Sequence, residues 1–290
     1  MNILVTFVQK KKNKINLQKN SSGEKLDSMR IYNSDFTQVL TSYTNNGDPL
    51  SDSGLLGSCV VNDKIYALGI RDVFEFDLEL NLLNKRSNIG DWLHDIEYHD
   101  GKLYCVNSYE GLITVLDLDL NIVENIKTKF LQNGAQAAHI NSIAFDSNNH
   151  PYIVSHNYDR EGYVYKLNDD LAFPICRNLN KPHDIRFVDN GYLICDSSNN
   201  SIIYNGLPIE SSWKTDVESF CRGLGVSENY YYVGSSKRET EDECEVLKIY
   251  KMNKKGRVEE IFNIDSLKTL GEIYSITVLQ PSKYNSKFSK

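Results

Sequence analysis

Apolar and polar residues alternate along most of this chain, and short turn signals interrupt the alternation at regular intervals. The clearest stretch is 93–108, where two alternating segments flank Asp100-Gly101. Alternation with a period of two is typical of a strand with one buried face, and Asp-Gly between two such segments predicts a tight hairpin. Further alternating segments at 112–119 and 122–129 complete a predicted unit of four antiparallel strands.

The same four-stranded unit recurs roughly every 40 residues, which is typical of the blades of a β-propeller. The two chain ends supply one further unit, because 271–282 has an inner-strand pattern and 1–45 supplies three more strands. The sequence therefore predicts a single all-β domain. It is a six-bladed β-propeller of four-stranded antiparallel blades, closed by a blade shared between the N- and C-termini. The predicted blades span 54–88, 92–131, 137–179, 181–215, 220–264, and 271–282 together with 1–45.

Composition narrows the classes of function. The net charge of −7 and the pI near 5.5 argue against nucleic-acid binding, which needs a basic face. No apolar run approaches the length of a membrane span, and the first residues lack the regions of a signal peptide. The six cysteines form no CxxC pair. We therefore expect a cytoplasmic protein with no nucleic-acid or membrane partner. The sequence leaves its oligomeric state open.

Polar residues at one end of the predicted inner strands should converge on one pocket, because inner strands line the central channel of a propeller. In each predicted inner strand we compare the residue that lies two positions before the first buried apolar residue, because side chains two residues apart share a face. The residue type at this position differs from blade to blade. Around the ring these positions are Gly57, His94, Asn141, His183, Arg222 and Tyr274, with His139 and Glu272 two residues further back. The ends of the second strands add Asn107, His156, Asp196 and Ser235, with Lys237 just beyond.

The histidines of this set suggest a metal centre. Neutral imidazole and carboxylate are ordinary ligands of Zn²⁺, Mn²⁺ and Fe²⁺. His94, His139 and His183, with Glu272 across the channel, therefore predict a site for one divalent ion of unknown identity. The alternative is that these side chains only hydrogen-bond one another and water in a filled polar channel.

The remaining polar residues suggest how a substrate would be held. Arg222 and Lys237 could bind a carboxylate or phosphate, which arginine does in bidentate fashion, or could form internal salt bridges to Asp196 or Glu272. Asn107, Asn141 and Asp196 are candidate substrate-binding residues, although Asn and Asp also form plain turns at strand ends. The sequence therefore leaves both a binding role and a structural role open for these residues.

The chain has no motif of a serine hydrolase, a nucleotide-binding fold or a thiol enzyme. The polar set suits proton abstraction next to a carboxylate or carbonyl, with Arg222, His156 and Tyr274 as catalytic residues. We therefore expect a metal-dependent lyase or isomerase, or a hydrolase, that acts on a small anionic or sugar-derived substrate. The alternative is a non-catalytic propeller that binds a glycan, peptide or protein partner through Trp92, Tyr109 and Tyr158 near the mouth.

Several longer motifs resemble a bacterial family of conserved hypothetical β-propeller proteins that carry a domain of unknown function. The resemblance covers about 54–282 and implies the same fold and the same axial residues, without implying a reaction. One departure is Asp184, where the family pattern has serine. The architecture is more distantly similar to gluconolactonase-like propellers, whose metal lies on the channel axis. The motifs are Leu-His-Asp-Ile, His-Ile-Asn-Ser-Ile, Lys-Pro-His-Asp-Ile-Arg, Arg-Gly-Leu with Tyr-Val-Gly-Ser-Ser-Lys-Arg-Glu, and Glu-Ile-Tyr-Ser-Ile-Thr-Val-Leu-Gln-Pro.

Overall fold

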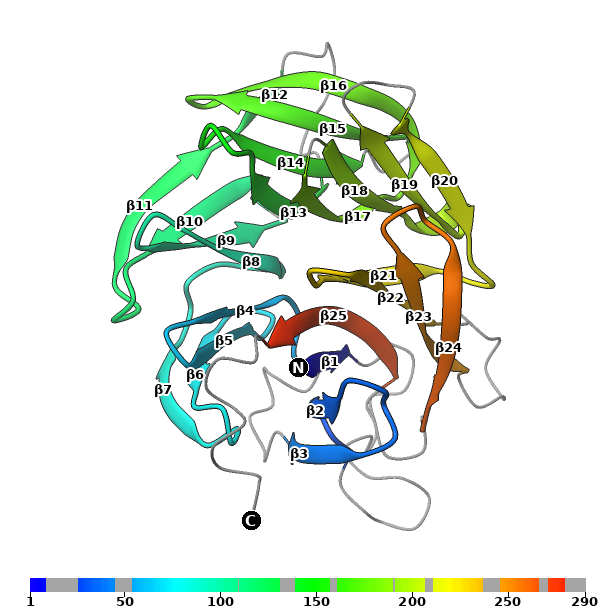
Figure 1. Cartoon of the computed structure of the whole chain (residues 1–290). Coiled ribbons are helices and arrows are strands. Elements are labelled where there is room, and N and C mark those ends of the chain that lie inside the picture. The colour runs from blue at the N-terminus through cyan, green and yellow to red at the C-terminus, as the bar shows by residue number, and fades with distance from the viewer. Residues whose placement is uncertain are drawn as a thin grey trace.

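The computed structural model of the chain is built from strands that form six antiparallel sheets around a central channel, which confirms the predicted six-bladed propeller (Figure 1). The inner and middle strands, such as β1 (Asn2–Val8) and β13 (His139–Phe145), are buried on both faces, because each sheet packs against both neighbouring sheets. Among the described residues, no helix is long and apolar enough to cross a membrane. The structure describes residues 1–8, 26–44, 54–108, 110–130, 139–156, 161–189, 191–206, 211–236, 246–265 and 271–279.

The blades are numbered here in chain order, and their strands are given from the channel outward. Blade 1 contains β4 (Ser58–Val61), β5 (Lys64–Leu68), β6 (Val73–Phe76) and β7 (Leu82–Arg86). Blade 2 contains β8 (Leu93–His99), β9 (Lys102–Asn107), β10 (Leu112–Leu116) and β11 (Ile122–Lys127). Blade 3 contains β13 (His139–Phe145), β14 (Pro151–His156), β15 (Glu161–Asn168) and β16 (Leu171–Asn180).

The second half of the ring follows the same plan. Blade 4 contains β17 (His183–Val188), β18 (Gly191–Asp196), β19 (Ser201–Gly206) and β20 (Trp213–Asp216), with the short 3₁₀ helix η1 (Ser197–Asn199) after β18. Blade 5 contains β21 (Cys221–Val226), β22 (Tyr230–Ser236), β23 (Leu247–Asn253) and β24 (Val258–Ile264). Blade 6 contains β25 (Glu272–Leu279), β1 (Asn2–Val8), β2 (Met29–Asn33) and β3 (Val39–Tyr43).

Blade 6 closes the ring as the sequence predicted, with its inner strand from the C-terminal part of the chain and its other strands from the N-terminal part (Figure 1). The strand β1 lies between β25 and β2, so both of its edges are paired. Its central residues Leu4 and Val5 are fully buried. Leu4 packs with Ile65 of blade 1 and Leu279 of β25, so this strand contributes to the core between two blades.

One blade differs from the predicted plan. The outer strand of blade 2 was expected to reach Lys129, but β11 ends at Lys127 and Lys129 begins a separate strand, β12 (Lys129–Phe130). This short strand pairs in parallel with β16, so the sheet of blade 3 has five strands. The Thr128 hydroxyl donates to Gly111 O of blade 2, while Lys129 N–H donates to Asp170 O of blade 3. The chain therefore changes blades at this point.

The inner strands share an irregularity that decides which side chains reach the channel. The strands β8, β13, β17, β21 and β25 each show a register shift against the neighbouring second strand. A β-bulge of this kind leaves one or two residues without a partner and redirects their side chains. The residues within the five shifts are His94 and Asp95, Asn141, Asp184, Arg222 and Gly223, and Tyr274.

Candidate functional site

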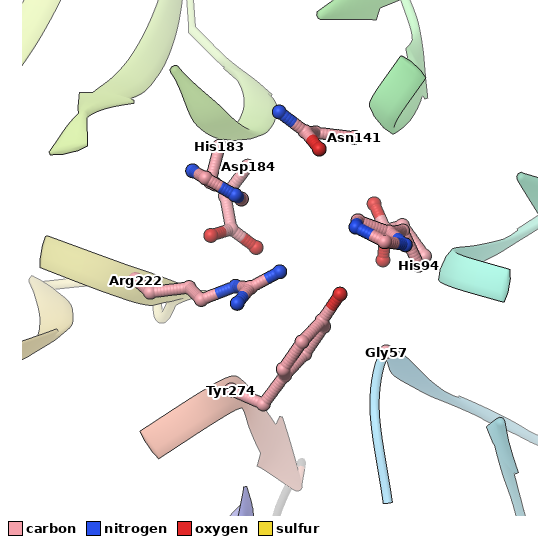
Figure 2. A pocket seen from close by; sticks show the side chains of 8 residues that line it. Gly57, His94, Asn141, His183, Asp184, Arg222 and Tyr274 are labelled. Atoms are coloured by element: carbon pink, nitrogen blue, oxygen red, sulfur yellow. The ribbon is translucent and has the colours of Figure 1, made fainter. Parts of the chain in front are cut away.

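The bulged residues meet in a small polar pocket on the channel axis (Figure 2). The pocket contains about 190 Å³ of empty space, in gaps narrower than a water molecule. An organic ligand could therefore enter only if the lining side chains moved apart. The residues that line the pocket are Gly57, His94, Asp95, Asn141, His183, Asp184, Arg222 and Tyr274.

Gly57 lets blade 1 approach this pocket closely. Its N–H donates to His94 O over 3.0 Å. A Cβ atom at this position would come within 2.6 Å of the Cα atom of Asp95, so any larger residue would clash with backbone. Blade 1 therefore contributes backbone to the pocket wall, where the other blades contribute side chains.

The Arg222 side chain is the cation of this pocket. It is 9% exposed, and its guanidinium carbon lies 3.4 Å from the centre of the Tyr274 ring, a stacked cation–π contact (Figure 2). Its nitrogens form no hydrogen bond or ion pair with any residue that the structure describes. A buried guanidinium has five N–H donors and is costly to leave without acceptors. An anion next to these nitrogens would supply the acceptors that they lack among the described residues.

The Tyr274 hydroxyl is the second polar group that lacks a partner. The residue is 6% exposed, and its oxygen is buried without a hydrogen bond to the described chain. Burial raises the pKa of this phenol above its usual value, against the opposing effect of Arg222. At neutral pH the group is therefore a protonated O–H that can donate a hydrogen bond or a proton to a ligand.

His94 and His139 are paired with each other. The His94 Nδ1–H donates to Trp92 O over 3.1 Å, so its Nε2 is an acceptor, and it lies 2.9 Å from His139 Nε2. The His139 Nε2–H must therefore be the donor of this bond. Burial and the neighbouring charges of His156 and Arg222 lower the pKa of His139 to about 3, and burial also places the pKa of His94 well below its usual value. Both imidazoles are neutral at physiological pH.

His183 repeats the local geometry of His94 but keeps one nitrogen available. Its Nδ1–H donates to Lys181 O over 2.9 Å, just as His94 bonds to Trp92 O, and the Ser197 hydroxyl, which donates to Cys195 O, lies 3.0 Å from the same nitrogen. Lys181 and Trp92 both have positive φ angles, 47° and 57°, which bend the chain so that its carbonyl meets the ring. Burial and the charge of Arg222 lower the pKa of His183. Its Nε2 is thus an unprotonated acceptor with no hydrogen bond to a described residue.

Asn141 presents an acceptor to the same space. Its Nδ2 donates to Pro182 O over 2.7 Å, which fixes the orientation of the amide. The opposite atom, Oδ1, is buried and has no hydrogen-bond partner in the described chain. The residue is 4% exposed. A ligand that donates a hydrogen bond to this oxygen would satisfy it.

Two carboxylates of the pocket were missed by the sequence analysis. Asp95 accepts a 2.5 Å hydrogen bond from the Ser142 hydroxyl and lies 3.4 Å from a nitrogen of Arg186. Asp184 has a φ of 49° and accepts the Gly223 N–H over 2.9 Å. Strand alternation places them on the face opposite to His94 and His183, and only the bulges bring them into the pocket. The repeated His-Asp pair in the sequence was the available signal.

Asp184 also makes a backbone contact next to Arg222. Its bond to the Gly223 N–H lies directly beside Arg222. Gly223 has a φ of 80°, and a Cβ atom there would crowd the Ile276 backbone and side chain. Burial raises the pKa of Asp184 to about 6, while Arg186 opposes this rise. Through its hydrogen bond to the Gly223 N–H, Asp184 fixes the bulge that carries Arg222.

Other predicted site residues lie outside the set that lines the pocket. Asn107 donates to Glu110, and Asp196 accepts from Asn180 N–H and from the Asn199 side chain, so both support local loops. The His156 ring lies 4.8 Å from that of His139, and Glu272 is a buried residue paired with Val8. Lys237, Tyr109 and Tyr158 lie outside the described residues.

Four histidines do gather at the axis as the sequence indicated. Ring centres are 4.6 Å apart between His94 and His139, 4.8 Å between His139 and His156, and 6.5 Å between His156 and His183. Over the ranges that the structure describes, however, no group of three or more His, Cys, Asp and Glu side chains is placed to hold a metal ion. The predicted metal centre therefore stays a prediction.

The comparisons with known proteins support the fold. No family model and no curated protein matches this chain. A protein of unknown function from Bacteroides caccae is 13% identical, with a TM-score of 0.68 over 95% of this chain and 97% of that one. A chain of a nidogen/laminin complex is 11% identical, with a TM-score of 0.68 over 96% and 98%. A "putative 6-phosphogluconolactonase" from Bacteroides fragilis is 11% identical, with a TM-score of 0.54 over 91% and 81%.

Proposed function

We propose that the axial pocket binds a small organic acid and moves a proton on the carbon next to its carboxylate. The observation that carries this proposal is Arg222, a buried guanidinium stacked on Tyr274 without a hydrogen-bonded anion among the described residues. Arginine binds carboxylates through two parallel hydrogen bonds, and each bond to a charged group contributes about 1.5–3 kcal/mol. A ligand carboxylate would therefore offset the cost of burying this charge.

Neutral groups around Arg222 suit the proton transfer. His183 Nε2 would accept the proton as general base, and the electron pair left on carbon would move into the carboxylate to form an enediolate. Arg222 would bind the added negative charge, and the protonated Tyr274 hydroxyl would donate to the same or a neighbouring oxygen. A bound carboxylate also cancels the charge of Arg222, which is the second cause of the low His183 pKa. Substrate binding would therefore make His183 a stronger base.

This role differs from the sequence-based assignment in one residue. His156 was the predicted proton carrier, but it lies against His139 and does not line the pocket. His183 lines the pocket and has an available nitrogen. The geometry therefore favours His183 as the base, with Arg222 in its predicted role and Tyr274, the other predicted proton carrier, as a hydrogen-bond donor. Proton abstraction of this kind belongs to lyase and isomerase chemistry.

The experiment is hydrogen exchange in D₂O, followed by ¹H NMR, with a panel of 2-hydroxy acids and sugar acids. The wild type should exchange the hydrogen at C2 of at least one acid. The His183→Gln variant should be slower by at least about 100-fold, which is the usual contribution of a general base. His150→Gln is the matched control, because His150 is 47% exposed and bonds only to Asp146 among described residues. Exchange that survives His183→Gln would overturn the assignment.

A divalent ion in the same channel is a second candidate feature. The observation that favours it is the fixed Nδ1–H of His94 and His183, because metal-bound histidines usually donate the other ring nitrogen to a carbonyl or carboxylate. His94, His139 and His183, with Glu272, would be the ligands, and the ion would polarise a bound oxygen. Metal analysis of protein purified without chelator tests this. Less than about 0.2 ion per chain after supplementation would exclude a tight site.

A binding module is the competing class of function. It draws on the likeness to a chain of the nidogen/laminin complex, which is a likeness of fold, and on Trp92, which is 37% exposed near the pocket. Under this reading the axial groups only stabilise the channel. Binding to a glycan or peptide array should then persist in a His94→Ala/His183→Ala double variant, whereas acid binding and exchange should be absent from the wild type.

A further inference from the structure

Two buried carboxylates stand beside the single arginine of the pocket. Asp184 is 7% exposed and is fixed by the Gly223 N–H, immediately next to Arg222. Asp95 is 3% exposed and is fixed by the Ser142 hydroxyl and the Ile96 N–H. Both line the same pocket as Arg222, and Figure 2 shows Asp184 next to the Arg222 side chain. An anion that enters the pocket therefore meets one positive and two negative side chains.

The charges outside the lining add no free cation to this balance. Arg186 reaches Asp95 at 3.4 Å and Glu97 at 3.8 Å, so its charge is already shared between carboxylates. The His94, His139 and His183 imidazoles are neutral, as shown above. Among the described groups, only Arg222 is thus available to compensate a ligand. One negative charge can be neutralised there, whereas a second would face Asp184 and Asp95 in a poorly solvated space.

The acceptors of the pocket indicate what else the ligand must carry. Asn141 Oδ1 is buried without a donor, and His183 Nε2 has an available lone pair. They come from adjacent inner strands, on the side of the pocket that faces Arg222 and Tyr274 (Figure 2). Both atoms can only accept, so a ligand that fits must bring at least two donors. Hydroxyl groups provide such donors without adding charge.

We propose that the pocket selects a hydroxylated monocarboxylate and rejects phosphorylated analogues, and that Asp184 is the residue that sets this selection. The inference rests on the proposed acid site and adds the class of acid. A carboxylate pairs with Arg222, one hydroxyl donates to Asn141, and a second hydroxyl donates to His183 Nε2 until that nitrogen takes the proton from C2. A phosphate ester would carry a second negative charge toward Asp184.

Isothermal titration with matched acids tests the selection. D-glycerate is the hydroxylated monocarboxylate, 3-phosphoglycerate adds a phosphate to the same skeleton, and propionate removes the hydroxyls. The wild type should bind D-glycerate at least about tenfold more tightly than either analogue. Asp184→Asn retains an oxygen that can accept the Gly223 N–H but removes the charge. It should tighten 3-phosphoglycerate binding by about tenfold and change D-glycerate binding little.

The control variant is Asp216→Asn, because the Asp216 side chain is 79% exposed. It should leave all three affinities unchanged. Equal binding of the three acids to the wild type, or a 3-phosphoglycerate affinity that Asp184→Asn does not raise, would overturn the selection but leave the acid site intact. Failure of every acid to bind the wild type would overturn the acid site itself. The Asn141→Ala variant adds an independent check, since it should weaken D-glycerate but leave propionate unchanged.

Discussion

His94 Nε2 and His139 Nε2 lie 2.9 Å apart on the channel axis, and His94 Nδ1 is bonded to Trp92 O. The carbonyl fixes the direction of the whole chain of hydrogen bonds, because it can only accept. His139 then donates to His94, which requires a neutral His94 ring, and the pKa of His139, lowered to about 3, keeps the second ring neutral as well. The two histidines therefore satisfy each other, which leaves His183 as the imidazole that can act on a ligand.

The tautomers provide the first prediction. Long-range ¹H–¹⁵N NMR spectra should show His94 and His183 with the proton on Nδ1 and His139 with the proton on Nε2. The pKa of His139 is lowered to about 3, and burial lowers the pKa values of His94 and His183 as well, so all three rings should stay neutral at pH 5. A protonated ring at His94 or His183 at pH 5, or the opposite tautomer, would contradict the geometry.

The closure of the ring gives a prediction about stability. Leu4 in β1 is fully buried between blades 6 and 1, whereas Leu83 in the outer strand β7 is 52% exposed. Leu4→Ala should lower the free energy of unfolding by about 2–5 kcal/mol, since it creates a cavity in the core. Leu83→Ala should change it by no more than about 0.5 kcal/mol. Denaturant unfolding measures both, and similar values would mean that β1 is not an interior strand.

Glu97 gives a prediction about pH. Burial raises its pKa from 4.5 to about 7, with Arg186 opposing and Asp95 adding to the rise. Between these two pH values the folded state binds a proton that the unfolded state has lost, so Glu97 makes the protein less stable as pH rises. The Glu97→Gln variant lacks the ionisable group and should not lose stability in this way. The stability of the variant relative to wild type should increase from pH 4.5 to about 7 and then level off.

An exposed glutamate, Glu259, provides the control for Glu97. Glu259→Gln changes an exposed carboxylate on the outer strand β24 and should give a difference that is independent of pH over this range. A Glu97→Gln difference that stays flat, or that falls as the pH rises, would show that Glu97 ionises normally in the folded protein.

The blades could be predicted because each one repeats a simple physical pattern. Alternating apolar residues and Asp-Gly or Asn-Asp turns mark the hairpins, as at Asp100-Gly101. Ring closure could be predicted because the inner-strand pattern at 272–279 is followed by no further strand pattern, and the strand pattern at 2–8 is preceded by no inner strand. The extra strand β12 was missed, because two residues are too short to carry a pattern and its pairing depends on the Asp170 carbonyl of another blade.

Part of the pocket lining could be predicted because each blade repeats the same strand pattern. Equivalent positions on the inner strands identified His94, Asn141, His183, Arg222 and Tyr274, all of which line the pocket. Alternation sent Asp95 and Asp184 to the other face, since a bulge has no simple sequence signal. Asn107 and Asp196 also could not be assigned from sequence, because a polar residue at a strand end can serve a loop as well as a ligand.

The central claim is that Arg222 binds the carboxylate of a small acid, and the most direct measurement is calorimetric titration of D-glycerate into wild type and Arg222→Met. Methionine retains much of the side-chain length but removes the charge and all donors, so affinity should fall by at least about tenfold. Arg257→Met, at an exposed arginine of blade 5, should bind as tightly as wild type. Equal affinity of wild type and Arg222→Met would contradict the claim.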